Sequence, residues 1–145
     1  MIVFMDTSSL LKLYHEELGT AELLVFLSQD IESIYLSELA ILEFCSAIWK
    51  KTRTGEITVN AATAAITCFQ NDFVKFQWIP IDNLLIQQAQ VLLMKYGSAG
   101  LRTLDAIQLA SAFLLNERKL DVCCLSADKL LQSFFTQEEL LTCFS

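Results

Sequence analysis

The sequence predicts an α/β fold in which a parallel sheet of about five strands is covered by helices on both faces. Short apolar runs, typical of buried strands, alternate along the chain with longer segments of helical period. Such alternation implies crossover connections, which make the strands parallel and place helices over both sides of the sheet. The chain has 145 residues, so we expect a single domain that spans residues 1–145.

The first half of the chain is expected to contain two strands and four helices. MIVFMD at the start is apolar, meets an acid at once and lacks a basic N-terminal region, so it predicts a strand rather than a signal peptide. Ser37 is a predicted helix N-cap, and the helix after it ends in a basic segment that suits the helix dipole. The expected strands are 1–6 and 33–36, and the expected helices are 8–16, 20–29, 37–53 and 59–75.

The second half is expected to contain three strands and two helices. QWIPI and DVCCLS are short apolar runs of the β type, and LLTCF is a weaker one. Thr103 is a plausible N-cap for the last expected helix. The expected strands are 77–81, 121–126 and 140–144, and the expected helices are 83–96 and 103–117.

Composition excludes several classes of protein. Hydrophobic residues make up 54% of the chain and charged residues 19%, which is far from the composition of a disordered protein. Glu38, Glu43 and Lys50 interrupt the longest apolar region, so no membrane span is expected. The net charge of −7 argues against a nucleic-acid binder that works through a broad basic surface.

The cysteines do not predict a metal site. There are five of them, they show no C-x-x-C spacing, and the chain contains a single histidine. A zinc site is therefore not expected. The simplest interpretation is a set of reduced, buried thiols in a cytoplasmic protein.

Four acids stand where a site could form. Asp6 closes the first expected strand and Asp128 lies just past the fourth, at the edge where parallel sheets bind ligands. Glu43 lies on a small, apolar side of its helix without a basic neighbour, and Asp105 lies in an apolar helix. Each also has a simpler explanation: Asp6 and Asp128 as caps, Asp105 through the helix dipole, and Glu43 as an acid at the helix rim.

Taken together, the acids indicate a metal site. Carboxylates that converge on one point repel each other, and a hard divalent cation such as Mg²⁺ or Mn²⁺ relieves that repulsion. A cation held in this way can activate water for displacement at phosphorus. It would also supply the positive charge that an acidic protein needs in order to act on RNA.

Four segments resemble the PIN-domain family, and more narrowly the VapC-type toxins of toxin–antitoxin pairs. These segments are MIVFMDTSSLLKLYHEE, the S-x5-E spacing from Ser37 to Glu43, LRTLDAIQLASA, and LSADKLL. They occur in the family's order over nearly the whole chain. The resemblance implies a three-layer α/β/α PIN-like fold with a central parallel sheet of about five strands. It also implies a Mg²⁺- or Mn²⁺-dependent endoribonuclease.

The resemblance assigns roles to individual residues. The acids of the family correspond to Asp6, Glu43, Asp105 and Asp128, which would hold one or two metal ions, with Asp6 and Asp105 as direct ligands. A supporting hydroxyl corresponds to Ser8, with Thr7 adjacent, and Ser126 is a second polar neighbour. Family members bind an antitoxin that covers the site, and they often form homodimers. Both partners are therefore expected here, together with an RNA substrate.

Three further features remain open to more than one interpretation. Arg53 and Arg102 are weak candidates for RNA contacts, although Arg53 also suits a helix C-terminus. Aromatic residues at 69, 73, 76 and 78 fit either the core or a groove that docks an antitoxin helix or a second subunit. Two other functions compete with the toxin: a PIN-like nuclease in RNA processing, and a non-catalytic module that keeps the fold. Phosphatase chemistry is disfavoured, because MDTSS lacks a D-x-D pair.

Overall fold

The structure is a computed structural model that describes residues 1–119 and 121–142. Within these residues, five strands form one sheet in the order β3-β2-β1-β4-β5, and every neighbouring pair is parallel. This arrangement confirms the predicted α/β class and its parallel sheet. The strands are β1 (Ile2–Met5), β2 (Ser33–Ser37), β3 (Gln77–Ile79), β4 (Cys123–Leu125) and β5 (Leu141–Thr142).

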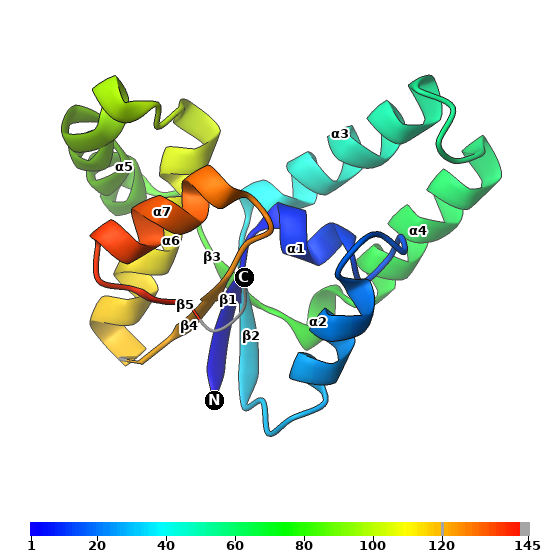
Figure 1. Ribbon diagram of the computed structural model, residues 1–145, viewed down its shortest axis with the longest axis horizontal. Helices are drawn as coiled ribbons and strands as arrows, with labels where there is room; N and C mark the ends of the chain where they lie inside the picture. The colour runs from blue at the N-terminus through cyan, green and yellow to red at the C-terminus, as the bar shows by residue number, and fades with distance from the viewer. Residues whose placement is uncertain (120, 143–145) are drawn as a thin grey trace.

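Helices cover both faces of the sheet, which confirms the three layers (Figure 1). The first four lie over one face and the last three over the other. Two short 3-10 segments, η1 (Phe73–Lys75) and η2 (Gly97–Ala99), follow α4 and α5. The helices of the described residues are α1 (Thr7–Leu11), α2 (Thr20–Leu27), α3 (Leu39–Arg53), α4 (Val59–Asn71), α5 (Asn83–Tyr96), α6 (Thr103–Lys119) and α7 (Lys129–Gln137).

The central strand β1 supplies side chains to two hydrophobic clusters. Val3 and Met5 pack into the cluster under the first four helices, whereas Phe4 packs into the cluster under α5, α6 and α7. All three side chains are fully buried. Successive strand residues point to opposite faces, so a continuous apolar run such as IVFM is what a strand buried on both faces requires.

The order of the strands reverses next to β1. From β1 the chain runs to β2 and β3 on one side, and it later returns to β4 and β5 on the other. The carboxyl ends of β1 and β4 are adjacent, because Met5 pairs with Leu125 and the backbone N–H of Asp6 donates to the Leu125 carbonyl over 3.1 Å. In open parallel sheets this is the point where ligands bind.

The predicted elements are present, with several differences. The helix predicted at 8–16 is the short α1, which ends at Leu11. The helix predicted at 59–75 is divided, because α4 ends at Asn71 and η1 follows. Helix α7 is not among the predicted elements, because Asp128 at its start fits a cap or turn equally well. Its apolar residues nevertheless follow a helical period after Asp128, since Leu131, Phe134 and Phe135 are buried. Part of the strand predicted at 140–144 lies outside the described residues.

The prediction of reduced thiols holds for only part of the described chain. Cys45, Cys68 and Cys124 are free, but Cys68 is exposed and Cys123 is disulfide-bonded, so the prediction of reduced, buried thiols is wrong at these two positions. The prediction relied on the spacing of the cysteines along the sequence, and that spacing does not show which side chains come into contact in the fold. Cys143 lies outside the described residues. No helix in 1–119 or 121–142 is both long enough and apolar enough to span a membrane.

The aromatic residues left open between core and groove belong to the core. Phe69 and Phe76 are buried, with exposed fractions of 1% and 8%. The ring of Phe69 contacts those of Phe73, Phe76 and Trp78, at centroid distances between 4.8 and 6.3 Å. This cluster fills the space between α4, η1 and β3.

Candidate active site

Asp6 is the most deeply buried acid of the candidate site, with an exposed fraction of 4%. It follows β1 and is the N-cap of α1, where Oδ1 accepts from the Ser9 backbone N–H over 3.1 Å. The hydroxyls of Ser8 and Ser126 also donate to its carboxylate, over 2.8 and 2.7 Å. Burial outweighs these donors and raises the pKa of Asp6 from 3.8 to about 6. The cap interpretation is therefore correct but incomplete, because Asp6 also faces a cavity described below.

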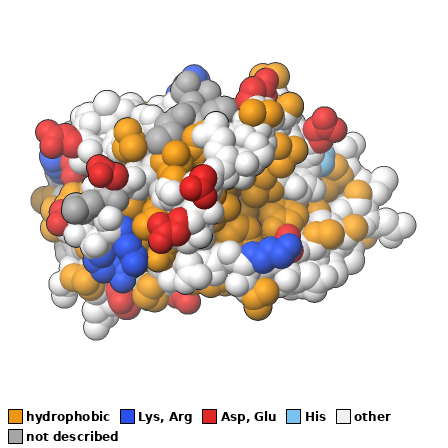
Figure 2. All heavy atoms as spheres, turned by 90° about the horizontal axis from the view of Figure 1, so that it is seen from below, with side chains coloured by type: hydrophobic (Ala, Val, Ile, Leu, Met, Phe, Trp, Pro, Cys, Tyr) orange, Lys and Arg blue, Asp and Glu red, His pale blue; other side chains and the backbone are white. Residues whose placement is uncertain are grey.

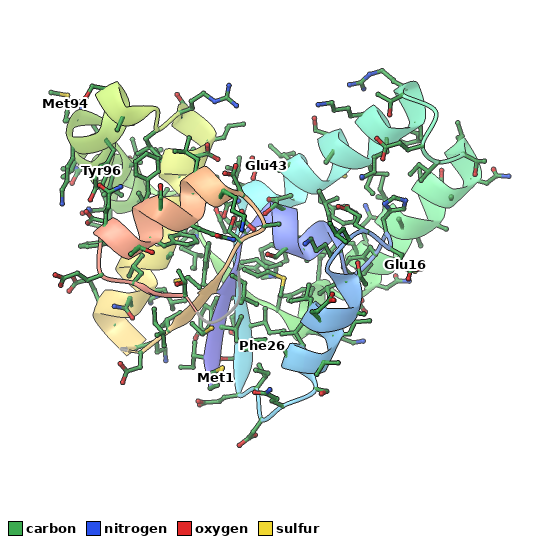
Figure 3. All side chains as sticks on the ribbon, in the orientation of Figure 1. Met1, Glu16, Phe26, Glu43, Met94 and Tyr96 are labelled. Carbon is green, nitrogen blue, oxygen red and sulfur yellow. The ribbon has the colours of Figure 1, made fainter. Side chains whose placement is uncertain are left out.

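Glu43 lies one turn into α3, where it is half-buried at the carboxyl edge of the sheet (Figure 3). Its Oε1 accepts from Thr7 Oγ1 over 2.7 Å and from Gln108 Nε2 over 2.8 Å. Gln108 Nε2 also donates to Thr7 Oγ1 over 3.2 Å. These three side chains, from α1, α3 and α6, form a closed hydrogen-bond triangle that orients the Glu43 carboxylate.

Asp105 lies in the first turn of α6 and is half-buried. Burial raises its pKa, and the negative charges of Asp128 and Glu43 raise the pKa further. The positive charge of Arg102 acts in the opposite direction. Asp105 therefore interacts electrostatically with two of the other acids, Asp128 and Glu43, which come from different elements.

Asp128 joins the site from the start of α7. Its Oδ1 accepts from the backbone N–H groups of Leu130 and Leu131, over 2.9 and 3.1 Å, so it caps the helix. Its own backbone N–H donates to Ser126 Oγ over 3.0 Å, and Ser126 Oγ in turn donates to Asp6. Ser126 thus connects the two acids that follow β1 and β4.

All four acids line one cavity of about 230 Å³, which we call the acidic pocket. Thr7, Ser8 and Gln108 line it with them, whereas Ser126 supports Asp6 and Asp128 from behind. Its residues are Asp6, Thr7, Ser8, Leu11, Glu43, Ala47, Asp105, Gln108 and Asp128. Such a set of hard oxygen donors suits Mg²⁺ or Mn²⁺. Among the described residues, however, no three Asp, Glu, His or Cys side chains already stand close enough to hold an ion.

The two predicted RNA-contact residues are placed differently. Arg102 immediately precedes α6 and acts electrostatically on Asp105. Arg53 is the last residue of α3, ten positions beyond Glu43, and is exposed. A helix rises 1.5 Å per residue, so Arg53 lies about 15 Å along the axis from Glu43. It does not line the acidic pocket.

Sequence reasoning missed Gln108. Its exposed fraction is only 3%, it bonds to Thr7 and Glu43, and its Oε1 is buried without a hydrogen-bond partner in the described structure. A signal was present, because Gln108 follows Asp105 by three residues and therefore shares its side of an otherwise apolar helix. A long polar residue at that position required a partner.

Several solved structures share this fold, whereas no curated protein sequence matches the chain. VapC20 of Mycobacterium tuberculosis, described as a Sarcin-Ricin loop cleaving toxin, aligns with a TM-score of 0.69 and 16% identity over 100% of both chains. VapBC2 of Rickettsia felis, bound to a promoter DNA fragment, aligns with a TM-score of 0.65 and 13% identity over 98% and 96% of the two chains. VapBC-1 of nontypeable Haemophilus influenzae aligns with a TM-score of 0.64 and 13% identity, over 99% of this chain and 98% of the other.

At these identities the structural likeness establishes the fold, and the sequence itself establishes the family. The family model for the PIN domain matches residues 3–132. The match covers most of the chain and contains Asp6, Glu43, Asp105 and Asp128. The chain therefore belongs to the PIN domain family.

Proposed function

We propose that the chain is a Mg²⁺- or Mn²⁺-dependent endoribonuclease and the toxin of a toxin–antitoxin pair. The observation that carries this proposal is the acidic pocket, where four carboxylates from three helices and a strand end line one cavity of about 230 Å³. The pocket lies at the reversal point of a parallel sheet in a PIN-domain chain. A nuclease needs such a concentration of acids only if a cation binds there.

The side chains of the acidic pocket fit a hard divalent cation. They offer carboxylate oxygens, and Gln108 adds a buried amide oxygen without a partner. Burial raises the pKa values of Asp6 and Asp105, so ion binding would displace protons and relieve the repulsion between the acids. The carboxylates of the described residues are not yet grouped closely enough to hold an ion, so ion binding would have to bring them closer together.

The residues of the acidic pocket would have different roles. Asp6 and Asp105 would hold the ion directly, while Thr7 and Gln108 orient Glu43. Ser8 and Ser126 each donate to Asp6, which fixes its carboxylate in one orientation. When bound, Mg²⁺ or Mn²⁺ lowers the pKa of water and neutralises the charge that develops at the phosphorus.

The charges on the surface agree with a metal-dependent mode of RNA binding. Figure 2 shows the end of the molecule that lies opposite Glu43, and the Lys and Arg side chains on that face are scattered and form no broad basic surface. The net charge of −7 points the same way. Attraction of RNA must then come from the bound cation and from a small number of positive side chains near it.

The test is a cleavage assay with the purified chain and total RNA. We expect cleavage with Mg²⁺ or Mn²⁺, none with chelator, and none by Asp105→Asn in the presence of metal. Asp30→Asn is the matched control, because Asp30 is exposed and does not line the acidic pocket. Cleavage that survives chelation, or full activity of Asp105→Asn, would overturn the assignment. An inactive wild-type chain would favour the non-catalytic alternative.

The solved structures of similar fold support the proposed toxin role. Two of the solved structures of similar fold are VapBC structures, and a third is a toxin–antitoxin complex from Klebsiella pneumoniae with a TM-score of 0.59 and 16% identity, over 87% and 86% of the chains. We infer a protein antitoxin that covers the acidic pocket, and action on cytoplasmic RNA. Expression of the chain alone should stop growth, and co-expression of a small adjacent open reading frame should restore it. Unimpaired growth on expression of an active nuclease would favour a role in RNA processing.

We also infer a homodimer. Leu84, Val91 and Met94 are exposed on α5, with exposed fractions between 58% and 83%, and their spacing places them along one side of the helix. Light scattering on the purified chain should give twice the mass of 16.4 kDa. Met94→Lys should shift the protein toward the monomer, and a monomeric wild-type chain would contradict the inference.

A further inference from the structure

A second cavity lies beside the acidic pocket and carries lysines in place of acids. Its volume is about 400 Å³, and we call it the lysine pocket. Lys12, at the end of α1, and Lys129, at the start of α7, both line it. Its residues are Ser9, Lys12, Leu18, Gly19, Glu22, Leu23, Ser126, Ala127, Lys129 and Gln132.

The two pockets share one dividing ridge. Ser8 lines the acidic pocket, and the next residue, Ser9, lines the lysine pocket. In the same way Asp128 lines the acidic pocket, while its neighbours Ala127 and Lys129 line the lysine pocket. The Ser9 backbone N–H and the Ser126 hydroxyl, on the lysine side, donate hydrogen bonds to Asp6 on the acidic side. Residues adjacent in sequence therefore line the two pockets, and a strand that crosses this boundary would reach both of them.

The side chain of Lys12 lies against the connection between α1 and α2. Its amine lies so close to Gly19 that a Cβ atom added there would stand 2.7 Å from Lys12 Nζ. Gly19 has a φ of +95°, a conformation that side-chain-bearing residues rarely adopt. The backbone carbonyl of Lys12 accepts a hydrogen bond from Thr20 Oγ1 over 3.2 Å. Lys12 is therefore half-buried as a residue, and its ammonium group lies against Gly19 in the α1–α2 connection.

The positive charges of this pocket are not used within the fold. Neither Lys12 nor Lys129 forms an ion pair with any residue in the part of the chain that the structure describes. Glu22 is the one acid among the lining residues, so two positive charges face a single negative one. The lysine pocket is therefore net positive, next to a pocket lined by four acids.

We propose that the lysine pocket binds a backbone phosphate of the RNA, adjacent to the phosphodiester that is cleaved in the acidic pocket. The proposal rests on the proposed ribonuclease function and specifies how the substrate is held. Consecutive phosphates of one strand are spaced regularly, so a strand that lies across the shared boundary of the two pockets can present neighbouring phosphates to both. Lysine is a point charge with three donors, and it contacts phosphate without reading sequence.

The test separates binding from cleavage. We would measure binding of a labelled single-stranded RNA oligonucleotide, in Mg²⁺, to the full chain that carries Asp105→Asn, so that the RNA stays intact. Adding Lys12→Gln and Lys129→Gln together should weaken binding by about 10-fold. It should also flatten the slope of log affinity against log salt by about 0.7 for each phosphate that the protein no longer neutralises. Glu22→Gln removes the only opposing charge and should strengthen binding a few-fold.

Lys119→Gln is the matched control. Lys119 is exposed at the far end of α6, fourteen residues from Asp105, or about 21 Å along the helix axis. Lys119→Gln also removes a positive charge, but it should leave the RNA affinity and the salt slope close to those of the parent Asp105→Asn chain. Lys119→Gln removes one charge and the double lysine variant removes two. If the loss of affinity for each charge removed is the same in both, the effect comes from net charge alone, and the proposal fails.

A kinetic experiment in the active chain distinguishes the two proposals. The lysine substitutions should raise KM for RNA and leave kcat and the Mg²⁺ requirement nearly unchanged. If the wild-type chain cleaves RNA and the double lysine variant has an unaltered KM and affinity, the lysine-pocket proposal is overturned and the ribonuclease proposal stands. A wild-type chain that binds RNA through the lysines but never cleaves it would overturn the ribonuclease alone. Absence of any RNA binding would overturn both.

Discussion

Gln108 donates a hydrogen bond from Nε2 to Oε1 of Glu43 over 2.8 Å, and its own buried Oε1 has no hydrogen-bond partner among the described residues. The two residues are far apart in sequence and come from helices on opposite faces of the sheet. Their contact, with Thr7 as the third member, closes the acidic pocket across the sheet edge. Gln108 therefore positions an acid that the sequence pattern alone left without a partner.

Removal of this amide should weaken metal binding. Gln108→Ala leaves Glu43 with Thr7 as its one remaining donor and deletes the free Oε1. Loss of such a supporting group typically costs about 10- to 100-fold in metal affinity or activity. A Mg²⁺ titration of cleavage should shift to higher concentration, and Gln108→Asn should recover only part of the loss because it is shorter. Gln90→Ala, on the exposed side of α5, should change nothing. An unshifted titration of Gln108→Ala would contradict the positioning role.

The stability of the metal-free protein should fall as the pH rises from about 4 to about 6. Asp6 has a pKa of about 6 in the fold against 3.8 outside it, so the folded state binds more protons between these values. Its contribution is therefore present in full below the unfolded pKa and is lost as the pH rises through the folded pKa. The loss amounts to about 3 kcal/mol for a shift of this size.

Asp6→Asn isolates this effect from other titrating groups. The amide cannot ionise and still caps a helix, so the unfolding free energy of the variant minus that of the wild type should increase from pH 4 to pH 8. Urea denaturation in chelator at several pH values measures the difference. A difference that stays constant with pH would show that the burial of Asp6 does not act in this way.

Divalent cations should stabilise the wild-type fold and should not stabilise a chain without its two direct ligands. A ligand at 100 times its dissociation constant adds about 2.7 kcal/mol when it binds only the folded state. Thermal unfolding in Mg²⁺, Mn²⁺ and chelator should show that either metal raises the unfolding temperature of the wild type. The double variant Asp6→Asn, Asp105→Asn should already be stable in chelator and gain nothing from metal. An equal gain in both chains would place the ion elsewhere.

Ser126→Ala should separate the two acids that it connects. The hydroxyl donates to Asp6 and accepts from the Asp128 backbone N–H, so its loss removes one partner from each. We expect cleavage to fall by about 10-fold or more at a fixed Mg²⁺ concentration, with partial recovery at high Mg²⁺. Ser133→Ala, at an exposed position on α7, is the control. Equal activity of the two variants would mean that Ser126 has no part in orienting the site.

Much of the architecture could be predicted because it depends on periodicity. The apolar run of β1 and the helical periods of α3, α5 and α6 are local patterns, and each one produced an element close to its predicted bounds. Helix α7 escapes prediction although its pattern is present, because Asp128 fits a turn or cap without the helix behind it. The disulfide of Cys123 had no local signal, because a covalent partner is chosen by distance in the fold.

The sequence by itself determined the chemical types at the site and the edge at which they would gather. An acid after a buried parallel strand must lie at the carboxyl edge, because the strand direction and the sheet order leave it no other place. Only the tertiary structure decided that Gln108 orients Glu43 and that Ser126 joins Asp6 to Asp128. It alone showed that Lys12 and Lys129 line a second pocket across the same ridge. Contacts between residues so distant in sequence depend on how helices pack across the sheet, and no local period records that packing.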